Sequence, residues 1–406
     1  MWELWALVAV GAVVVAILFV VVTSSKSANE ASHPVVHKRW TPSHVATQKT
    51  GRRYLVIGGH GFLGSHIVEA LLARGEKDIW VFDASPSPLF EDERKVNFIR
   101  GDILNKDHLL NACYGRDVVF HTAALVNYWS RLKHDYDKIY KVNYVGTKNV
   151  IEACRTASVK KLIYSSTASM FVTAETLKKP IRDQREDTLL YPEEPLCHYT
   201  HTKMLAEKLV LASNGYSGVL TAAIRPNGIY GPRDALIGGV IATGAPGIGH
   251  VNNKQDYVYV ENLVHGFLKL EESLAPGSPA AGKAYFITDN EPLGYFDFNS
   301  KFSGYFGNEF KLLPRLVPIV LSYVVETIAW LSKGRIPLGQ LQILTPPTIV
   351  IASSEYYFST EKAQKDLGWK PLFTVDEGMK NTAEYFKSLK EENRIREGKK
   401  EGKKNK

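Results

Sequence analysis

The stretch VIGGHGFLG, Val56 to Gly64, decides which fold this chain of 406 residues adopts. It joins a short apolar run to an amphipathic segment that ends near Gly75, a pattern typical of a strand followed by a helix. Gly58, Gly61 and Gly64 recur at intervals of three residues. Glycines at such a turn let backbone N–H groups approach a pyrophosphate, and the helix N-terminus adds a favourable partial charge. A plain strand-to-helix turn is the alternative interpretation.

A second apolar strand, DIWVFD, ends at Asp83, nineteen residues beyond Gly64. A carboxylate at this place accepts hydrogen bonds from the adenosine ribose hydroxyls and repels a 2′-phosphate. The pattern therefore predicts a dinucleotide site that favours NAD over NADP, unless Asp83 is only a turn residue. The other residues of this region predicted to contact the dinucleotide follow the glycine turn or a strand end, and they are Phe62, Leu63, Asp102, Ile103, Ala123 and Ala124.

Short apolar runs alternate with helical segments as far as about residue 230, and one of these segments predicts a long helix over about residues 135–157. This alternation predicts an α/β fold with a doubly wound parallel sheet of the Rossmann type, covered by helices on both faces. The pattern then loosens, which predicts a smaller C-terminal substrate-binding subdomain that returns strands to the core. The predicted organisation is a membrane anchor at 1–23, a linker at 24–52, an NAD-binding domain with the catalytic residues at 53–230, a substrate-binding region at 231–388 and a basic tail at 389–406.

Tyr199 and Lys203, in the stretch HYTHTK, are four residues apart and share one face of a predicted helix. This helix follows the strand KKLIYSS. A second Tyr-x-x-x-Lys copy, Tyr144 to Lys148, precedes the same strand, on the wrong side for chemistry at the strand's carboxyl end. The first copy is therefore predicted to be the catalytic one.

The predicted chemistry is the oxidation of a secondary alcohol, which requires a base. A free tyrosine, with a pKa near ~10, is mostly protonated at neutral pH. The Lys203 ammonium is expected to lie near the Tyr199 hydroxyl and to lower its pKa. Thr167, with Ser166 as second choice, would hold the substrate oxygen at the strand end. Hydride then passes to the nicotinamide and the proton to Tyr199.

Two histidines, His198 and His201, flank this pair and raise the question of a metal site. No third ligand of suitable type is fixed near them in the sequence, so no metal is predicted. His121 is expected to be a satisfied core histidine. The three cysteines show no CxxC spacing, which indicates buried thiols in a reducing compartment and argues against a disulfide framework or a zinc site.

An uncharged apolar run of nineteen residues, Leu4 to Val22, lies near the N-terminus. As a helix of about 1.5 Å per residue it nearly matches a hydrocarbon core of ~30 Å. A cleavable signal peptide would have positive charge before the run, but only Glu3 precedes it. Lys26, Lys38 and Arg39 follow it, so the positive-inside rule predicts a retained single-pass anchor with the catalytic domain in the cytosol.

The formal charge of +8 is concentrated at the C-terminus, where the last twenty residues hold nine Lys or Arg against four Glu. This composition predicts a solvated, disordered end, or one that lies against anionic lipid. No aromatic residue is interleaved with the final basic ones, so no nucleic-acid partner is predicted. Lys403 and Lys404 resemble a dilysine retrieval signal, which together with the predicted anchor indicates the endoplasmic-reticulum membrane.

A second apolar run, Pro314 to Leu331, is interrupted by Pro318 and Glu326. A charge at the centre of a bilayer costs about 3 kcal/mol on insertion scales. This run is therefore expected to form an interfacial or core helix rather than a second membrane span.

The motifs GGHGFLG, GDI, HTAA, VNYVGTKNV, YSSTA, YTHTK and RPNGIYGP occur in this order along the chain. Their set and order resemble the extended short-chain dehydrogenase/reductases, and within these the 3β-hydroxysteroid dehydrogenase group. The resemblance implies that Tyr199 is the proton acceptor, Lys203 its cofactor-binding partner and Thr167 the hydroxyl residue. It further implies that Asn143 supports a proton relay and that Pro226 lines the nicotinamide, although alone these two would read as a helix-surface residue and a turn residue.

The resemblance implies an NAD-dependent oxidation of the 3β-hydroxyl of a sterol, and it is closest to members whose substrate is a 4α-carboxysterol. Oxidation then gives a β-keto acid, which loses CO₂ readily because the departing electrons enter the new ketone as an enol. The expected partners are the sterol, membrane lipid and other enzymes of sterol biosynthesis, and a homodimer is compatible with the resemblance. Arg233 is a candidate for holding the carboxylate, with a surface arginine or a partner for Asp234 as the alternatives.

Three alternatives stay open at this point. A 3β-hydroxysteroid dehydrogenase/Δ5-isomerase would act on uncarboxylated steroids with the same residues. A non-catalytic NAD-binding scaffold for sterol enzymes at the membrane would not need the intact Tyr199, Lys203 and Thr167. A reductase acting on nucleotide sugars or flavonoids would not need the anchor or the long apolar C-terminal segment.

Overall fold

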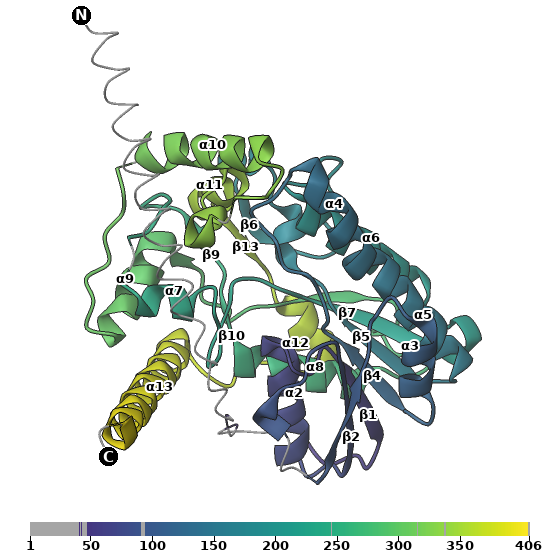
Figure 1. The fold of residues 1–406 in the computed structure, drawn as a ribbon. Coiled ribbons are helices and arrows are strands. Elements are labelled where there is room, and N and C mark those ends of the chain that lie inside the picture. The colour runs from purple at the N-terminus through teal and green to yellow at the C-terminus, as the bar shows by residue number, and fades with distance from the viewer. Residues whose placement is uncertain are drawn as a thin grey trace, which may run out of the picture.

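The computed structural model describes residues 40, 42, 47–90, 94–244, 246–314, 316–336 and 338–404 (Figure 1). The predicted anchor, Leu4 to Val22, and most of the predicted linker lie outside these residues. Within the described ranges, every helix is too short or too polar to cross a membrane.

The body is built on a parallel sheet whose strands follow the order β11-β7-β5-β4-β1-β2-β3. From β1 the chain winds outward to β3, then crosses back to β4 and continues on the other side. The carboxyl ends of β1 and β4 diverge at this crossing, which is where open α/β sheets bind dinucleotides. The seven strands are β1 (Arg53–Ile57), β2 (Asp78–Asp83), β3 (Val96–Arg100), β4 (Val118–His121), β5 (Lys161–Ser165), β7 (Leu220–Pro226) and β11 (Ala284–Ile287).

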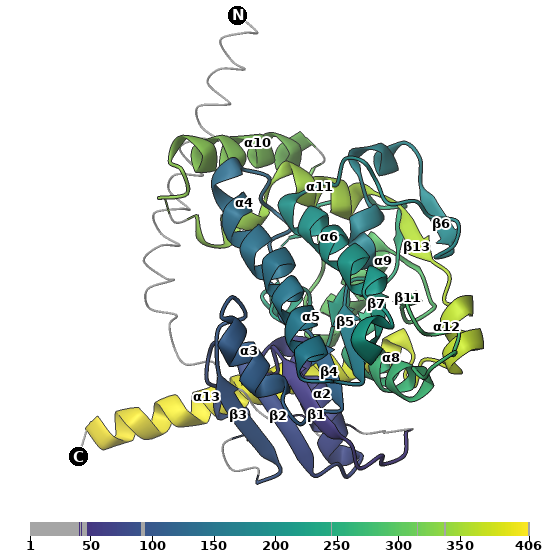
Figure 2. The same cartoon turned by 90° about the vertical axis from the view of Figure 1, so that its right-hand side faces the viewer.

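Helices cover both faces of the sheet, so the predicted doubly wound architecture is confirmed (Figures 1 and 2). On one face lie α2 (Phe62–Ala73) and α8 (Val260–Ser273), which pack against each other. On the other lie α3 (Lys106–Cys113), α5 (Gly146–Thr156) and α6 (His198–Ala212). The central strands β4 and β5 are buried along their whole length, which explains why each contains three consecutive apolar residues, VVF and LIY, rather than an alternating pattern.

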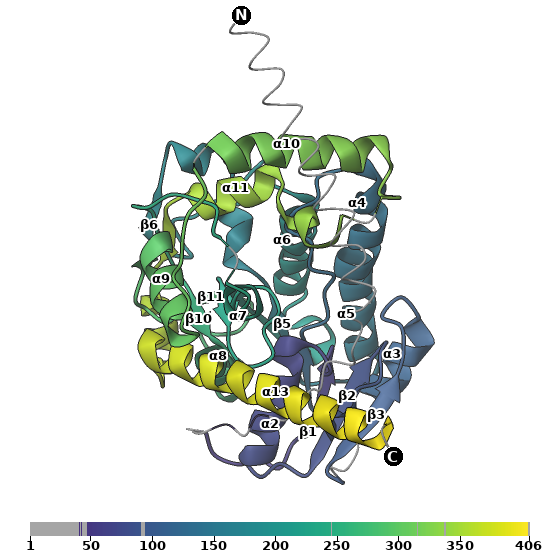
Figure 3. The ribbon, with the colours of Figure 1, turned by 60° about the vertical axis from the view of Figure 1, so that its left-hand side comes forward.

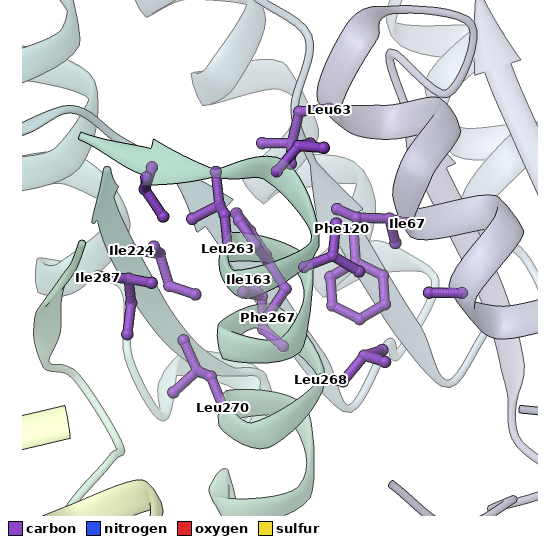
Figure 4. Close-up of a cluster of buried hydrophobic side chains, with 14 of the residues drawn as sticks. Leu63, Ile67, Phe120, Ile163, Ile224, Leu263, Phe267, Leu268, Leu270 and Ile287 are labelled. Carbon is purple, nitrogen blue, oxygen red and sulfur yellow. The ribbon is translucent and has the colours of Figure 1, made fainter. Parts of the chain in front are cut away.

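Each face of the sheet has its own hydrophobic core. Beneath α2 and α8, Phe120 and Ile163 of the strands meet Ile67, Leu263 and Phe267 of the helices, all fully buried (Figure 4). Full burial of one such side chain contributes about 1.5–3 kcal/mol. The two cores fix the directions of the strands and therefore the positions of the loops that leave their carboxyl ends.

The glycine turn holds β1, α2 and the segment after β4 in close contact. Gly58 has φ 83°, and a Cβ there would lie 2.6 Å from the backbone nitrogen of Ala123. A Cβ on Gly64 would lie 2.1 Å from the carbonyl oxygen of Gly58. Side chains at these two positions would push apart the elements that form the crossing.

The long helix expected over about residues 135–157 is present, but it contains an irregular turn. It runs as α4 (Lys133–Tyr140), a π-helical turn at Lys141–Val145 and α5. A π turn inserts an extra residue into a helix and is frequent at functional sites. Here it contains Asn143, which is almost fully buried.

The region after β7 forms a second, smaller unit whose last core strand, β11, returns to the main sheet beside β7. Three of its short strands, β9 (Lys254–Gln255), β12 (Leu293–Gly294) and β13 (Tyr356–Phe358), form a four-stranded sheet with β6 (Ile181–Gln184), which precedes β7 in the chain. Two others, β8 (Ile229–Tyr230) and β10 (Val258–Tyr259), form a separate pair. Its helices include α9 (Tyr295–Tyr305), α10 (Leu316–Leu331) and α11 (Pro346–Ser353). Helix α10 lies along one end of the molecule, on α11 (Figure 3).

The expectation of a disordered C-terminal end is wrong. Helix α13 begins at Val375 and continues to Lys404, through most of the basic tail. The tail is rich in Glu, Lys and Arg, which are good helix formers, and pairs of opposite charge one turn apart support it, such as Arg394 with Glu391 at 2.9 Å.

Candidate active site

The glycine turn gives α2 an N-terminus that can hold a pyrophosphate. The helix begins after Gly61, and among the described residues no side chain caps it there. The amides of Phe62 and Leu63 in the first turn therefore lack a side-chain acceptor at the crossing. A Cβ on Gly61 would approach only the Gly58 carbonyl oxygen, at 3.2 Å, so this position is less confined than Gly58. These features fit a dinucleotide phosphate.

Asp83 stands at the end of β2, as predicted, and takes part in the turn as well. Its Oδ2 accepts from the backbone nitrogen of His60 and its Oδ1 from that of Ser85, both at 3.1 Å. The His60 ring lies against Phe98, with centroids 4.6 Å apart. The two interpretations of Asp83 are compatible, because a carboxylate fixed by two amides still has lone pairs for ribose hydroxyls.

The other predicted cofactor contacts lie around the same crossing. Asp102 is exposed and accepts from the Leu104 backbone nitrogen at 2.9 Å, while Ile103 is buried against Gly146. Ala123 donates its backbone N–H to Ile57 at 3.0 Å. Ala124 follows it and is half-buried, and Pro226 is the last residue of β7, buried at the strand's carboxyl end.

The predicted catalytic side chains converge at the carboxyl end of β5. Tyr199 and Lys203 occupy the first two turns of α6 and are 5% and 2% exposed. Thr167 follows β5 and caps a short 3-10 helix, and its Oγ1 lies 2.7 Å from the Oγ of Ser169. Ser166 is buried near Glu207 instead, and its Oγ has no hydrogen-bond partner among the described residues.

The expected lowering of the Tyr199 pKa does not occur in the structure. Burial raises the pKa of Tyr199 well above its ordinary value, and the neighbouring phenols of Tyr128 and Tyr164 raise it further. Burial disfavours the phenolate because a charge loses its solvation in a medium of low dielectric constant. The free protein therefore holds Tyr199 as a neutral phenol.

The Lys203 side chain points to the strand rather than to the Tyr199 hydroxyl. Its ammonium donates to the carbonyl oxygen of Ser165 and lies 4.1 Å from the centroid of the Tyr164 ring. Burial lowers the pKa of Lys203 to about 7, against an opposing effect of the Glu207 carboxylate. Lys203 is thus close to its titration point at neutral pH.

A buried ion pair behind Lys203 was not predicted from the sequence. Glu207, one turn after Lys203 on α6, binds Arg225 of β7, with Nη2–Oε1 at 2.7 Å, and accepts from the Tyr191 hydroxyl at 2.7 Å. Although burial favours the neutral acid, Arg225 keeps the pKa of Glu207 below its ordinary value. A signal was available, since Glu207 repeats the four-residue spacing that joins Tyr199 to Lys203.

Asn143 in the π turn fixes the backbone after β4. Its Oδ1 accepts from the Leu125 nitrogen at 2.8 Å, and its Nδ2 donates to the Leu125 oxygen at 3.1 Å and to Thr202 Oγ1 at 3.2 Å. It is therefore a buried link between the loop after β4 and helix α6, and not a residue of the helix surface.

Tyr128, on the loop after β4, is a site residue that the sequence analysis missed. Its ring meets that of Tyr199 edge to face, with centroids 4.5 Å apart. The carboxyl ends of parallel strands carry functional loops, and Tyr128 follows β4 closely enough for this rule to have drawn attention to it.

The histidines near the pair have structural contacts. His198 Nε2 lies 3.0 Å from the Leu132 carbonyl oxygen, and His201 is stacked on Tyr136. His121 is a buried core histidine, as predicted, but only one of its ring nitrogens is satisfied: Nε2 lies 2.9 Å from Thr147 Oγ1, while Nδ1 has no hydrogen-bond partner among the described residues. Burial lowers the pKa of His121 to about 3. No group of three or more metal-ligating side chains occurs in the part of the chain that the structure describes.

Arg233 is neither on the surface nor paired with Asp234, so both of those expectations are wrong. Its guanidinium is buried and binds Glu69 of α2 through two bonds, Nη1–Oε1 at 3.0 Å and Nη2–Oε2 at 2.6 Å. Asp234 instead accepts from the backbone nitrogens that follow it, including Gly238 at 2.6 Å.

The structure combines a parallel sheet, a site for a dinucleotide at its strand ends and a buried tyrosine. This combination defines a class of protein, the NAD-dependent oxidoreductases that act on a CH–OH group. The profile of the 3-beta hydroxysteroid dehydrogenase/isomerase family matches residues 55–315. The chain belongs to this family, and the resemblance seen in its motifs is confirmed.

Similar proteins of known name support the assignment. The chain is 36% identical to the human "Sterol-4-alpha-carboxylate 3-dehydrogenase, decarboxylating" over 352 residues, which is 84% of this chain and 90% of that one. It is 35% identical to the "3-beta-hydroxysteroid dehydrogenase" of Mycolicibacterium neoaurum, over 83% of this chain and 92% of that one.

Solved structures show the same fold at lower identity. An epimerase from Methanothermobacter thermautotrophicus has a TM-score of 0.64 at 20% identity, covering 86% of this chain and 95% of its own. A UDP-glucuronic acid 4-epimerase from Bacillus cereus, solved with NAD, has a TM-score of 0.62 at 21% identity, covering 83% of this chain and 99% of its own.

Proposed function

We propose that this protein oxidises the 3β-hydroxyl of a 4α-carboxysterol with NAD, and that the product loses CO₂. The observation that carries the proposal is the 36% identity, over 84% of the chain, to a protein named for this reaction. The buried Tyr199, Lys203 and Thr167 at one strand end supply the groups that an alcohol oxidation requires.

Within this proposal, Tyr199 accepts the proton of the substrate alcohol and Thr167 holds its oxygen. NAD, when bound, accepts the hydride. The glycine turn and the first amides of α2 would hold its pyrophosphate, Asp83 its adenosine ribose, and Lys203 its nicotinamide ribose. Lys203 would then have a second role. Its protonated form, if close to the Tyr199 hydroxyl, would lower the pKa of Tyr199, which burial has raised.

Decarboxylation needs no further residue in this scheme. The β-keto acid formed at C3 and C4 places the carboxylate next to a ketone that accepts the departing electron pair. Arg233 is bound to Glu69 through both ends of its guanidinium, so we do not assign it to the substrate carboxylate.

We also propose that the enzyme works at a lipid surface. The outward face of α10 carries an exposed apolar stripe, made of Leu316, Val317, Val320 and Tyr323 in the first half of the helix and of Trp330 and Leu331 at its end. Tyr and Trp at such a face favour the boundary between headgroups and acyl chains. The apolar run Leu4 to Val22 would anchor the chain in the endoplasmic-reticulum membrane with the catalytic domain in the cytosol, beside other enzymes of sterol biosynthesis.

Product analysis with a 4α-carboxysterol and NAD tests the reaction. The expected result is formation of NADH together with CO₂ and a 3-keto sterol. A second candidate is a dehydrogenase/isomerase, since a Mycobacterium tuberculosis relative of that name is 33% identical over 84% of this chain. This candidate predicts a conjugated enone from pregnenolone, without CO₂. Binding of NAD without turnover of either substrate would favour a scaffold and contradict the proposal.

A further inference from the structure

Hydrogen bonds join the second turn of α6 to the carboxyl ends of two neighbouring strands. Helix α6 packs against β7 (Figure 2). From α6, Lys203 donates to the carbonyl oxygen of Ser165, the last residue of β5. The next residue, Ser166, donates its backbone N–H to the carbonyl oxygen of Ile224 on β7 at 2.7 Å. Lys203 is therefore held against a frame that the ends of β5 and β7 make together.

Arg225, which follows Ile224 on β7, returns this network to α6. Its Nε donates to Oε2 of Glu207 at 3.0 Å and its Nη2 to Oε1 at 2.7 Å, and such a two-bond contact fixes both direction and distance. The Tyr191 hydroxyl donates to the same Oε1 at 2.7 Å. The guanidinium carbon lies 4.9 Å from the centroid of the Phe171 ring. The network thus closes on Glu207, one turn after Lys203.

Charge connects Lys203 and Glu207 as well as geometry. Their side chains lie four residues apart on α6, a spacing that places them on one face of the helix, and the residues are 2% and 0% exposed. Arg225 carries its charge at any pH at which the protein is folded. One buried carboxylate therefore serves two basic side chains, and its charge opposes the loss of the Lys203 proton that burial favours.

The other titratable groups that face Lys203 are neutral around pH 7. Its Nζ lies 4.1 Å from the centroid of the Tyr164 ring, and the His121 ring lies beside Tyr164, with centroids 5.2 Å apart. Burial raises the pKa values of Tyr164 and Tyr199 far above the ordinary value and lowers that of His121 to about 3. Among these groups, Glu207 is the anion on which the Lys203 charge depends.

We propose that Glu207 is a positioning residue, which with Arg225 holds Lys203 in its charged form at the carboxyl end of β5, where the nicotinamide ribose would bind. The inference rests on the proposed function, in which Lys203 binds that ribose. An ammonium donates stronger hydrogen bonds to ribose hydroxyls than a neutral amine does. Glu207 thus acts on the cofactor through Lys203 and touches neither cofactor nor substrate.

Binding of NAD to the full-length chain, measured by titration calorimetry without sterol between about pH 5 and pH 9, tests this role. The affinity of the wild type should fall about tenfold as pH rises through the pKa of Lys203, about 7. Glu207→Gln keeps the size of the side chain and removes its charge, so the fall should occur about one pH unit lower. Glu207→Asp keeps the charge, and its midpoint should stay close to that of the wild type.

Glu271 of α8 provides the matched control. It is also fully buried, its Oε2 lies 3.3 Å from Arg74 Nη1, and its Oε1 lies 3.8 Å from Lys161 Nζ, at the amino end of β5. Glu271→Gln therefore removes a similar buried charge at the opposite end of the same strand. It should lower the midpoint of thermal unfolding and leave the midpoint pH of NAD binding unchanged.

Glu207→Gln leaves the Arg225 charge buried without a counterion, which can prevent folding. The double variant Glu207→Gln/Arg225→Gln avoids this problem because it leaves no unpaired charge in the network. It should show the same direction of shift, since Lys203 has still lost its carboxylate.

A wild-type midpoint in folded Glu207→Gln, or in the double variant, would show that Glu207 only supports the fold and would overturn the proposal. A midpoint in Glu207→Asp as low as that in Glu207→Gln would overturn it too, because the charge would then not be the cause. The same holds for an affinity of the wild type that does not change with pH.

The two proposals fail in different ways, because NAD binding is measured without a sterol. If the protein does not turn over the 4α-carboxysterol and the midpoint shifts as expected, only the proposed reaction is wrong. If the protein turns over the carboxysterol and the midpoint does not move in Glu207→Gln, only the role of Glu207 is wrong.

Discussion

Tyr199 and Lys203 are both almost completely buried, and burial shifts their pKa values in opposite directions. The phenol is held neutral and the ammonium loses its proton near pH 7, since both charged forms lose solvation in the protein interior. In the free protein the two residues are therefore not a phenolate and an ammonium. Residues that share a helix face need not share a hydrogen bond, and here Lys203 bonds Ser165.

Replacing Tyr199 with Phe tests its role as the base. The ring stays and the proton acceptor is lost, so kcat should fall about 10²- to 10⁴-fold, with the midpoint of thermal unfolding nearly unchanged. NAD-dependent turnover and a melting curve measure the two effects. Tyr216→Phe, at an exposed position, is the control. Turnover by Tyr199→Phe at the wild-type rate would remove this residue from the mechanism.

Among the elements, the π turn between α4 and α5 does most to shape the site. It turns Asn143 inward, where the side chain bonds the loop after β4 and reaches α6. Helical periodicity predicted one continuous helix over this region, and a single extra residue in a turn leaves no trace in such a pattern. The family resemblance implied that Asn143 supports a proton relay. Only the folded chain shows that the π turn places the Asn143 side chain in the interior, where it can do so.

Asn143→Ala removes three hydrogen bonds from the buried link between the loop and α6. Unsatisfied backbone groups at Leu125 should cost about 1–3 kcal/mol of the free energy of unfolding, and the Leu125 amide should exchange faster. Urea unfolding and hydrogen exchange measure these effects. Asn299→Ala, which loses one bond within α9, is the control and should have a smaller effect. Equal effects in both variants would contradict a special role for Asn143.

The apolar stripe of α10 makes a second prediction at the scale of an element. Charges at Val320 and Leu331 should weaken contact with lipid, so the double variant Val320→Glu/Leu331→Glu should have a higher KM for a sterol carried in phosphatidylcholine vesicles. With detergent-dispersed sterol its KM should equal that of the wild type. Tyr114→Glu, at an exposed position on α3's C-terminal side, is the control. A higher KM in both media would indicate a damaged pocket rather than a lost lipid contact.

At the scale of the molecule, two buried carboxyl groups join segments that are far apart in the chain. Asp256 accepts from the Phe358 nitrogen of β13 at 2.5 Å. Asp289, after β11, accepts from the Tyr259 nitrogen at 2.9 Å and the Tyr230 hydroxyl at 2.9 Å. Burial raises the pKa of Asp256 to about 8 and that of Asp289 to about 7. Both carboxyls are thus protonated in the folded protein below these values.

The raised pKa of Asp256 makes stability depend on pH in a definite direction. The unfolded chain ionises near pH ~4, so the contribution of Asp256 is fully present below that pH and is lost as pH rises toward about 8. Asp256→Asn removes this dependence. Between pH 5 and 7 the wild type should therefore lose up to about 1.4 kcal/mol per pH unit relative to the variant, as measured by urea unfolding. A constant difference across this range would contradict the raised pKa.

The sequence by itself determined the parallel sheet, the position of the glycine turn, the family, and the placing of Tyr199, Lys203 and Thr167 at the end of one strand. These follow from spacing along the chain, because strand, turn and helix are local, and because the turn positions of Gly58 and Gly64 have no room for a side chain. The tertiary structure alone decided the partners: Lys203 with Ser165, Arg233 with Glu69, Glu207 with Arg225, and Tyr128 with the site. Such contacts join residues far apart in the chain, and burial, which sets their pKa values, depends on the packing of the whole molecule.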